Sequence, residues 1–369
     1  MRSKPNEPPK IDLPAPADAL AEQLVGWFRT AARDLPWRVE RTPYRVWLSE
    51  IMLQQTRVAT VIDYFLRFTE RFPNVHALAN AGQDEVLALW SGLGYYARGR
   101  NLHRAAQYVS RELGGEFPST VEGLLQLPGV GPYTAGAIAS LAFQQAAPIV
   151  DGNVSRVLSR LCDDDTPIDA PRGKAGTSAR ATSLVEATPT PALLNEGLME
   201  LGALVCTPRS TDCDICPWQQ ACLARARHTV AQRPVKLPRK TRKEMQLVAV
   251  VVRHRGKVWL ERRAEGGLFG AMFEPPVQEL KKSSAWREVA TSLLRDRDLP
   301  VPAQLPKPIR VQRTLTHREL LFDVVCIELE TAPDGTNWYN KAQLGEIGLS
   351  SAVRAVLDAV PPRQRELAL

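Results

Sequence analysis

The chain has 369 residues, which is too long for one typical domain and predicts two domains, each large enough to bury a core. Its formal net charge of +7 and its pI near 9.2 favour a polyanionic partner. A membrane or secreted protein is disfavoured, because no stretch is apolar enough to span a bilayer and the N-terminus lacks the apolar core of a signal peptide. We therefore expect a monomeric cytoplasmic protein, associated with the nucleoid if the source is bacterial.

The first segments predict a loose leader and then a helix. Residues 1–17 are rich in proline, and we expect them to be disordered. From Ala19 to Arg33 the apolar residues return at helical spacing, which predicts a helix with one buried face. The sequence Leu-Pro-Trp-Arg at residues 35–38 then ends this helix.

A carboxylate lies near the start of the next predicted helix, which runs from Val46 to Phe72. Glu50, like Gln54 and Gln55, is surrounded in sequence by large apolar residues. Such surroundings desolvate a carboxylate, raise its pKa and suit it to donate a proton near neutral pH. The segment alone equally allows Glu50 to lie on an exposed stripe of the helix.

A glycine-rich loop at residues 92–98 carries two adjacent tyrosines beside an arginine. Tyr95 and Tyr96 could stack on bases or wedge into a duplex. Spacing alone favours the simpler interpretation, in which both tyrosines pack inside the protein.

Residues 127–157 predict two helices joined by a tight glycine turn, Leu-Pro-Gly-Val-Gly, with the second helix starting at Pro132. The backbone N–H groups at such a helix start attract a phosphate, although an ordinary helical turn has the same sequence features. Asp151 follows an apolar run and precedes a helix expected from Val154. On this evidence Asp151 could be no more than a helix cap.

Two further segments precede the cysteine-rich region. Residues 163–182 are polar and predict a surface loop. From Leu193 to Val205 the pattern is again helical, and it places Glu196 and Glu200 one turn apart on an otherwise apolar helix.

Four of the six cysteines fall within seventeen residues, separated by six, two and five residues. They are Cys206, Cys213, Cys216 and Cys222. This density predicts a metal centre in a reducing cytosol rather than a disulfide framework. The spacing favours a [4Fe-4S] cluster, with zinc as the alternative, because zinc sites usually have two short spacers around a longer one.

After the cysteines the composition changes. Residues 233–243 are basic and contain two prolines and no acid, which predicts an extended linker. Strands are expected at 247–253, 257–262 and 319–329, and a helix at 286–294. The C-terminal part is therefore expected to be α+β, whereas the first part is mainly α-helical.

Together these segments resemble the MutY-type adenine DNA glycosylases of the helix–hairpin–helix superfamily. The resemblance covers nearly the whole chain from about Ala19, and its motifs occur in the family's order: LPWR, PYRVWLSEIMLQQTRVATVI, GLGYYARGRNLH, LPGVGPYTAGAI, VDGNVSRV, NEGLMELGALVC and the four-cysteine loop. It implies removal of adenine mispaired with 8-oxoguanine or guanine in double-stranded DNA, with an iron–sulfur cluster as cofactor.

The resemblance also implies a domain organisation. We expect a helical helix–hairpin–helix glycosylase domain at residues 18–226, with its iron–sulfur loop at 206–222. A basic linker at 227–244 would connect it to a NUDIX-like lesion-recognition domain at 245–362, followed by a tail at 363–369.

Carried over by position, the resemblance implies four catalytic residues. Glu50 resembles the acid that protonates adenine and later activates water. Asp151 resembles the carboxylate that stabilises the positive sugar, by its charge or by a covalent adduct. Tyr133 and Asn153 match positions that hold these groups in place. Two carboxylates in different environments suit an oxocarbenium-like transition state.

Other matching positions would bind DNA. Residues matching the pocket for the extruded adenine are Trp37, Arg38, Gln55 and Glu196. Flipping is required because a base inside a duplex is out of reach. Tyr95 and Gln54 match residues near the orphaned partner base, and the hairpin residues Gly129, Val130 and Gly131 would grip the DNA backbone.

One absence separates relatives within the superfamily. Members that also cut the strand use a lysine amine in the hairpin helix as nucleophile. Between Val121 and Arg160 this chain has no lysine, and Tyr133 stands at that position. We therefore expect a monofunctional hydrolase. The alternatives are a pyrimidine-lesion glycosylase with lyase activity and a noncatalytic DNA-binding protein, which would need neither Glu50 nor Asp151.

The C-terminal part resembles the NUDIX-like module of the family, but without its metal-binding glutamates. Thr291 and Ser292 stand where paired glutamates would be expected, so recognition of 8-oxoguanine is the better hypothesis there than catalysis. The family's Phe-Ser-His loop corresponds to Leu315, Thr316 and His317. Thr316 and His317 are therefore expected to contact the lesion, without an aromatic wedge.

Overall fold

The computed structural model describes residues 12–360 except 239–240, 281–284, 332, 334 and 336. Most of the expected leader and the whole expected tail lie outside these residues. By its internal contacts the chain divides into two units, and each is described by itself. The first comprises Met1–Ala79 with Arg104–Arg239, and the second Asn80–His103 with Lys240–Leu369. The domain limits expected from the sequence stay predictions.

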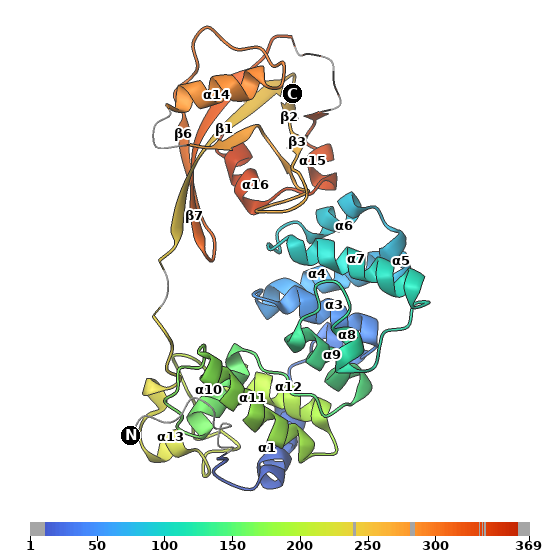
Figure 1. The fold of residues 1–369 in the computed structure, drawn as a ribbon, viewed down its shortest axis with the longest axis vertical. Coiled ribbons are helices and arrows are strands. Elements are labelled where there is room, and N and C mark those ends of the chain that lie inside the picture. The colour runs from blue at the N-terminus through green and yellow to red at the C-terminus, as the bar shows by residue number, and fades with distance from the viewer. Residues whose placement is uncertain are drawn as a thin grey trace. The chain divides into compact units, whose positions relative to one another are not determined.

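Helices make up the part of the chain before the linker (Figure 1). In chain order they are α1 (Ala17–Ala31), α2 (Pro36–Val39), α3 (Pro43–Leu53), α4 (Val58–Arg71), α5 (Val75–Asn80), α6 (Gln83–Trp90), α7 (Ala97–Glu112), α8 (Val121–Leu124), α9 (Pro132–Phe143), α10 (Gly152–Leu161), α11 (Pro171–Glu186), α12 (Pro191–Leu204), α13 (Leu223–Ala226) and the 3-10 turn Val230–Gln232. None of the helices in the described ranges is both long and apolar enough to cross a membrane.

Two expectations about these helices were wrong. The helix expected from Val46 to Phe72 is two helices, because the chain leaves α3 at Gln54 and Gln55 adopts a left-handed conformation with φ 57°. The loop expected at 163–182 contains the first part of α11, which starts with Pro171 in its first turn, a favoured position for proline. Small polar residues concealed this helix.

Packing of α1, α10, α11 and α12 forms one apolar core, which Trp218 of the cysteine loop closes. Glycine lets α12 come close to the start of α10. A Cβ atom on Gly202 would lie only 2.6 Å from the Cβ atom of Asn153. This close approach brings residues of α12 beside the loop that carries Asp151.

The glycine turn before α9 forms as expected. Gly129 has φ 76°, a conformation that favours glycine, and Gly131 is the residue before the first turn of α9. Pro132 occupies that first turn, so the backbone N–H groups of the turn are left without helical partners.

The second unit contains a mixed sheet in the order β6-β7-β1-β2-β8, with β5 also paired to β1. Its strands are β1 (Lys243–His254), β2 (Lys257–Trp259), β5 (Val277–Glu279), β6 (Ile309–Thr314), β7 (Arg318–Glu328) and β8 (Trp338–Tyr339), and a separate pair is formed by β3 (Glu261–Arg262) and β4 (Phe273–Glu274). The long central pair β1 and β7 is parallel.

Helices cover both faces of this sheet. Alternate residues of β1 explain this, because Ala249 and Val251 pack against α16 (Ser351–Asp358), while Val248 and Val250 pack against α14 (Trp286–Arg295). The short helix α15 (Gln343–Glu346) also belongs to this unit, as do α6 and the start of α7 from before the linker. The α+β expectation for this part is confirmed.

Candidate active site

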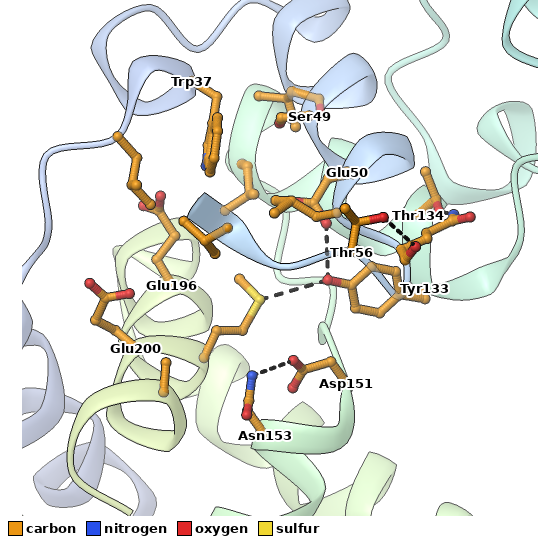
Figure 2. A pocket seen from close by; sticks show the side chains of 18 of the residues that line it. Trp37, Ser49, Glu50, Thr56, Tyr133, Thr134, Asp151, Asn153, Glu196 and Glu200 are labelled. Atoms are coloured by element: carbon orange, nitrogen blue, oxygen red, sulfur yellow. Dashed lines mark hydrogen bonds between the residues drawn. The ribbon is translucent and has the colours of Figure 1, made fainter. Parts of the chain in front are cut away.

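A cavity of about 710 Å³ in the first unit brings together most of the residues singled out from the sequence (Figure 2). Helices α2, α3 and α12, the turn after α3 and the starts of α9 and α10 all contribute to its wall. The singled-out residues that line it are Trp37, Arg38, Glu50, Gln54, Gln55, Gly129, Gly131, Tyr133, Asp151, Asn153 and Glu196. Val130 is buried and is not among the residues of the wall.

Glu50 projects from α3 and is only 4% exposed, so the interpretation of a desolvated carboxylate is correct and that of an exposed stripe is wrong. Burial raises its pKa to about 7, although a hydrogen bond from the Tyr133 hydroxyl to Oε2, at 2.9 Å, opposes this. A carboxyl group with such a pKa exchanges its proton readily near neutral pH.

Asp151 caps α10 and also lines the cavity. Its Oδ1 accepts a hydrogen bond from the Val154 N–H at 2.7 Å, and its Oδ2 accepts one from the Asn153 amide at 2.9 Å. Burial raises the pKa of Asp151, while these hydrogen bonds to the ionised form oppose the rise. The two carboxyl groups in the cavity therefore have different environments, which is how proteins assign different proton roles to similar groups.

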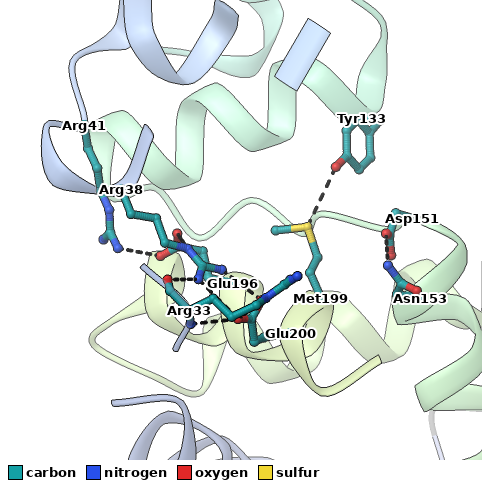
Figure 3. A network of polar contacts seen from close by, with 9 residues as sticks. All are labelled: Arg33, Arg38, Arg41, Tyr133, Asp151, Asn153, Glu196, Met199 and Glu200. Carbon is teal, nitrogen blue, oxygen red and sulfur yellow. Dashed lines mark hydrogen bonds and ion pairs between the residues drawn. The ribbon is translucent and has the colours of Figure 1, made fainter. Parts of the chain in front are cut away.

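The Tyr133 hydroxyl connects α9 to side chains of α3 and α12. The group donates to Glu50 (Figure 2) and also lies 3.8 Å from the Met199 sulfur (Figure 3). Burial, followed by the nearby carboxylates, raises the pKa of Tyr133 well above its ordinary value, so the hydroxyl remains a neutral donor. Nothing in the sequence pattern had pointed to Met199.

Two glutamates of α12 and three arginines form an ion-pair network at one end of the cavity (Figure 3). Glu200 accepts hydrogen bonds from the Arg33 backbone N–H and guanidinium, at 2.7 to 2.9 Å, and from Arg38 at 3.2 and 3.3 Å. Glu196 binds Arg38 at 3.1 Å and Arg41 at 2.6 Å.

The network gives its two carboxylates opposite pKa shifts. Burial would raise the pKa of Glu200, but the hydrogen bonds from Arg33 and Arg38 outweigh it and lower that pKa to about 2. For Glu196, burial outweighs the charges of Arg41 and Arg38 and raises the pKa. Sequence reasoning noted Glu200 but missed its partners, although two acids one turn apart on an apolar helix call for buried cations.

Comparison with known proteins bears on this cavity. Residues 48–171 match the model for the HhH-GPD superfamily of base excision DNA repair proteins, and residues 247–359 match the NUDIX domain model. A curated adenine DNA glycosylase of Mus musculus is 36% identical over 93% of this chain and 78% of its own length. Another, from Buchnera aphidicola, is 31% identical over 92% of this chain and 97% of its own length.

The chain belongs to the adenine DNA glycosylase family. It is an enzyme with an N-terminal helical HhH-GPD domain and a C-terminal NUDIX-like domain. A solved structure of a thermostable thymine-DNA glycosylase covers 57% of the chain and 97% of its own length, at 26% identity and a TM-score of 0.50, which supports the helical fold.

A further arginine ties the loop that carries Asp151 and Asn153 to the cysteine loop. The Arg156 guanidinium donates to Asn153 Oδ1 at 2.8 Å, to the Gly202 carbonyl at 2.7 Å and to the Cys206 carbonyl at 2.8 Å. Asn153 in turn donates to Asp151. Sequence reasoning did not single out Arg156, because an arginine within a helix gives no sign of being buried.

The four clustered cysteines line one small pocket of about 30 Å³ beside Arg160. The Arg160 guanidinium lies 3.3 Å from the Cys206 sulfur. Within the described ranges these side chains do not gather as the ligands of a single metal ion would. Burial raises the pKa of the Cys216 thiol to about 12.

The remaining singled-out residues belong to the second unit. Tyr96 is buried, as expected, but the packing expectation for Tyr95 was wrong, because that side chain is 42% exposed and its backbone is left-handed, with φ 48°. The Tyr95 and Thr316 hydroxyls contact each other. His317 lies exposed beside Thr316 in the turn between β6 and β7. On α14, the Ser292 hydroxyl donates to Asp296 at 3.2 Å.

Proposed function

We propose that this protein hydrolyses the N-glycosidic bond of adenine mispaired with 8-oxoguanine or guanine in duplex DNA. Family membership supports the reaction class. The observation that carries the proposal is the placement of Glu50 and Asp151 in one cavity. Glu50 has a pKa of about 7, and Asp151 accepts hydrogen bonds that favour its ionised form.

In the proposed reaction the adenine leaves the duplex and enters the cavity, since its glycosidic bond is out of reach while the base is stacked. Glu50 in its neutral form gives its proton to the adenine ring, which makes the base a better leaving group. Asp151 faces the positive charge that develops on the sugar as the glycosidic bond breaks, and water then adds to the sugar and gives its proton to the Glu50 carboxylate. Tyr133 and Asn153 hold the two carboxyl groups.

Recognition of the base is assigned to Trp37, Arg38, Gln55 and Glu196. Glu196 Oε2 is ion-paired with Arg41 at 2.6 Å. A carboxylate oxygen has a second lone pair, so Oε2 can also accept a hydrogen bond from an amino group such as that of adenine. Gln54, whose amide donates to Thr134 at 3.1 Å, is assigned with Tyr95 to the region of the partner base.

We propose a monofunctional reaction, because the hairpin region lacks a lysine and the Tyr133 hydroxyl is held by Glu50. Strand cleavage through a Schiff base needs an amine at that place. Borohydride should accordingly capture little or no enzyme–DNA adduct. Efficient trapping would contradict this part of the proposal.

We propose that Cys206, Cys213, Cys216 and Cys222 hold a [4Fe-4S] cluster. All four cysteines line one pocket, and their spacing of six, two and five residues favours the cluster over zinc, whose sites usually have two short spacers around a longer one. When bound, the cluster would fix the cysteine loop against α10. Visible absorbance of freshly purified protein, with iron and zinc analysis, separates the two cofactors.

The C-terminal unit is proposed to recognise 8-oxoguanine through Thr316 and His317, with no catalysis on α14 because Thr291 and Ser292 are not metal ligands of a NUDIX enzyme. The monomeric state and the cytoplasmic location stay predictions.

Single-turnover release of adenine tests the proposed function. Duplexes should carry 8-oxoguanine, guanine or cytosine opposite adenine, and release should be fastest opposite 8-oxoguanine. Glu50→Gln and Asp151→Asn should bind these duplexes nearly as well as the unaltered protein and release no base. Near-normal turnover by either variant would overturn the assigned roles.

A further inference from the structure

The cavity that Glu50 and Asp151 line is called the base cavity here. A second cavity adjoins it at Tyr133 and Asp151. It measures about 770 Å³, and the two cavities share four wall residues at the starts of α9 and α10: Pro132, Tyr133, Asp151 and Gly152. The hairpin glycines Gly129 and Gly131 line only the base cavity. A strand whose adenine enters the first cavity would therefore pass close to the second, since the two share the wall that carries Asp151.

Two lysines from distant parts of the chain line this second cavity. Lys174 comes from the first turn of α11, and Lys236 comes from the basic segment that follows the cysteine loop. Both are exposed, and neither has an ion-pair partner among the described residues. The hydroxyl residues Ser155 and Ser178 also line the cavity.

The basic segment is fixed to the first unit at this place. The Ile168 N–H donates to the Val235 carbonyl at 3.0 Å, and the Leu237 N–H donates to Asp169 Oδ1 at 2.9 Å. These bonds flank Lys236 and hold it beside the cavity. They also engage the Asp169 carboxylate, the one acid of the wall besides Asp151.

We propose that this cavity is a backbone subsite, in which Lys174 and Lys236 bind a phosphate of the adenine-carrying strand next to the flipped nucleotide. The inference rests on the proposed function. A sugar held at Asp151 has a phosphate on each side, and the hairpin glycines can engage one of them from the base cavity. The lysines engage the strand on the opposite side of the wall, so the flipped nucleotide is held from both sides.

The salt dependence of duplex binding tests the subsite. Each phosphate contact contributes about 0.9 to the slope of log affinity against log salt, so Lys174→Ala and Lys236→Ala should each lower the slope by about that amount and the double variant by about twice as much. Lys174→Arg should keep the slope. The matched control is Arg29→Ala, which removes an exposed charge of α1 that lines neither cavity.

A neutral methylphosphonate placed singly along the adenine strand locates the contact. At one position next to the adenine, the substitution should weaken binding by the unaltered protein and not by the double variant. An unchanged salt slope in the double variant would overturn the subsite. So would a methylphosphonate that weakens binding by the double variant as much as by the unaltered protein at every position. If the unaltered protein released no adenine from any duplex, the proposed function would fail instead, and the binding slopes would still decide on the subsite.

Discussion

At the scale of single residues, the environment of Glu50 sets a pH dependence. The neutral form is the proton donor, and with a pKa of about 7 its population falls about tenfold per pH unit in more alkaline solution. Asp151 must be ionised, and its raised pKa adds a loss of rate in acid. We expect a bell-shaped profile for single-turnover adenine release whose alkaline limb lies near pH 7. A rate independent of pH through neutrality would exclude Glu50 as the donor.

Glu200 is the second residue whose role depends on its neighbours. It is 1% exposed and holds both Arg33 and Arg38, so Glu200→Gln leaves Arg33 without its ion-pair partner and leaves Arg38 with Glu196. Removing one member of a fully buried ion pair costs about 3–5 kcal/mol, and because the Arg33 side chain is 36% exposed we expect a smaller loss, about 1–3 kcal/mol, in the free energy of unfolding. Urea unfolding measures it.

The same substitution should slow base release, because Arg38 would lose one of the two glutamates that orient its guanidinium. Glu200→Asp keeps the charge and should recover part of both losses. A Glu200→Gln protein with normal stability and normal release would contradict the network's positioning role.

At the scale of elements, the contact between α12 and the start of α10 leaves no room for a side chain on Gly202. Gly202→Ala would force a Cβ atom against Asn153, and overpacking of this kind costs about 1–3 kcal/mol. Because Asn153 orients Asp151, release should slow as well.

A second glycine supplies the control for this prediction. Gly26 lies within α1 with no atom near the position of a Cβ, so Gly26→Ala should stabilise the protein by about 0.5–1 kcal/mol and leave release unchanged. Thermal unfolding measures the change in stability of the two variants, and single-turnover release of adenine measures the change in rate. Equal effects of the two substitutions would contradict the close approach.

Helix periodicity predicted most elements but not their interruptions. The pattern from Val46 onward stays helical through Gln54 and Gln55, and only the packed structure shows the chain leaving the helix there. The helix at Pro171 was missed because its polar and small residues carry no apolar stripe, and its buried positions include glycine, threonine and arginine.

At the scale of the whole molecule, residue pattern predicted two domains of different class, and family resemblance was needed to join Glu50 to Asp151. No local pattern relates residues a hundred positions apart. Arg33 and Arg41 of the glutamate network and the bridge through Arg156 were missed for the same reason, since a surface arginine and a buried one look alike in sequence.

The lesion-recognition proposal belongs at this scale, because it assigns specificity and chemistry to different units. His317→Ala and Thr316→Val should each lower the preference for 8-oxoguanine over guanine opposite adenine by about fivefold, the worth of one hydrogen bond of about 1 kcal/mol. Release opposite guanine should not change. Ser292→Ala removes a hydroxyl of α14 in the same unit and serves as the control.

The left-handed backbone of Gln55 places two kinds of selection in conflict. A glycine there would relieve strain of about 1 kcal/mol or more, so any library sorted for folded protein should drift towards glycine at this position. The same library sorted for repair should retain the amide, because its side chain lines the base cavity. Gln55 would thus be retained for its contribution to DNA repair, although it costs the fold some stability.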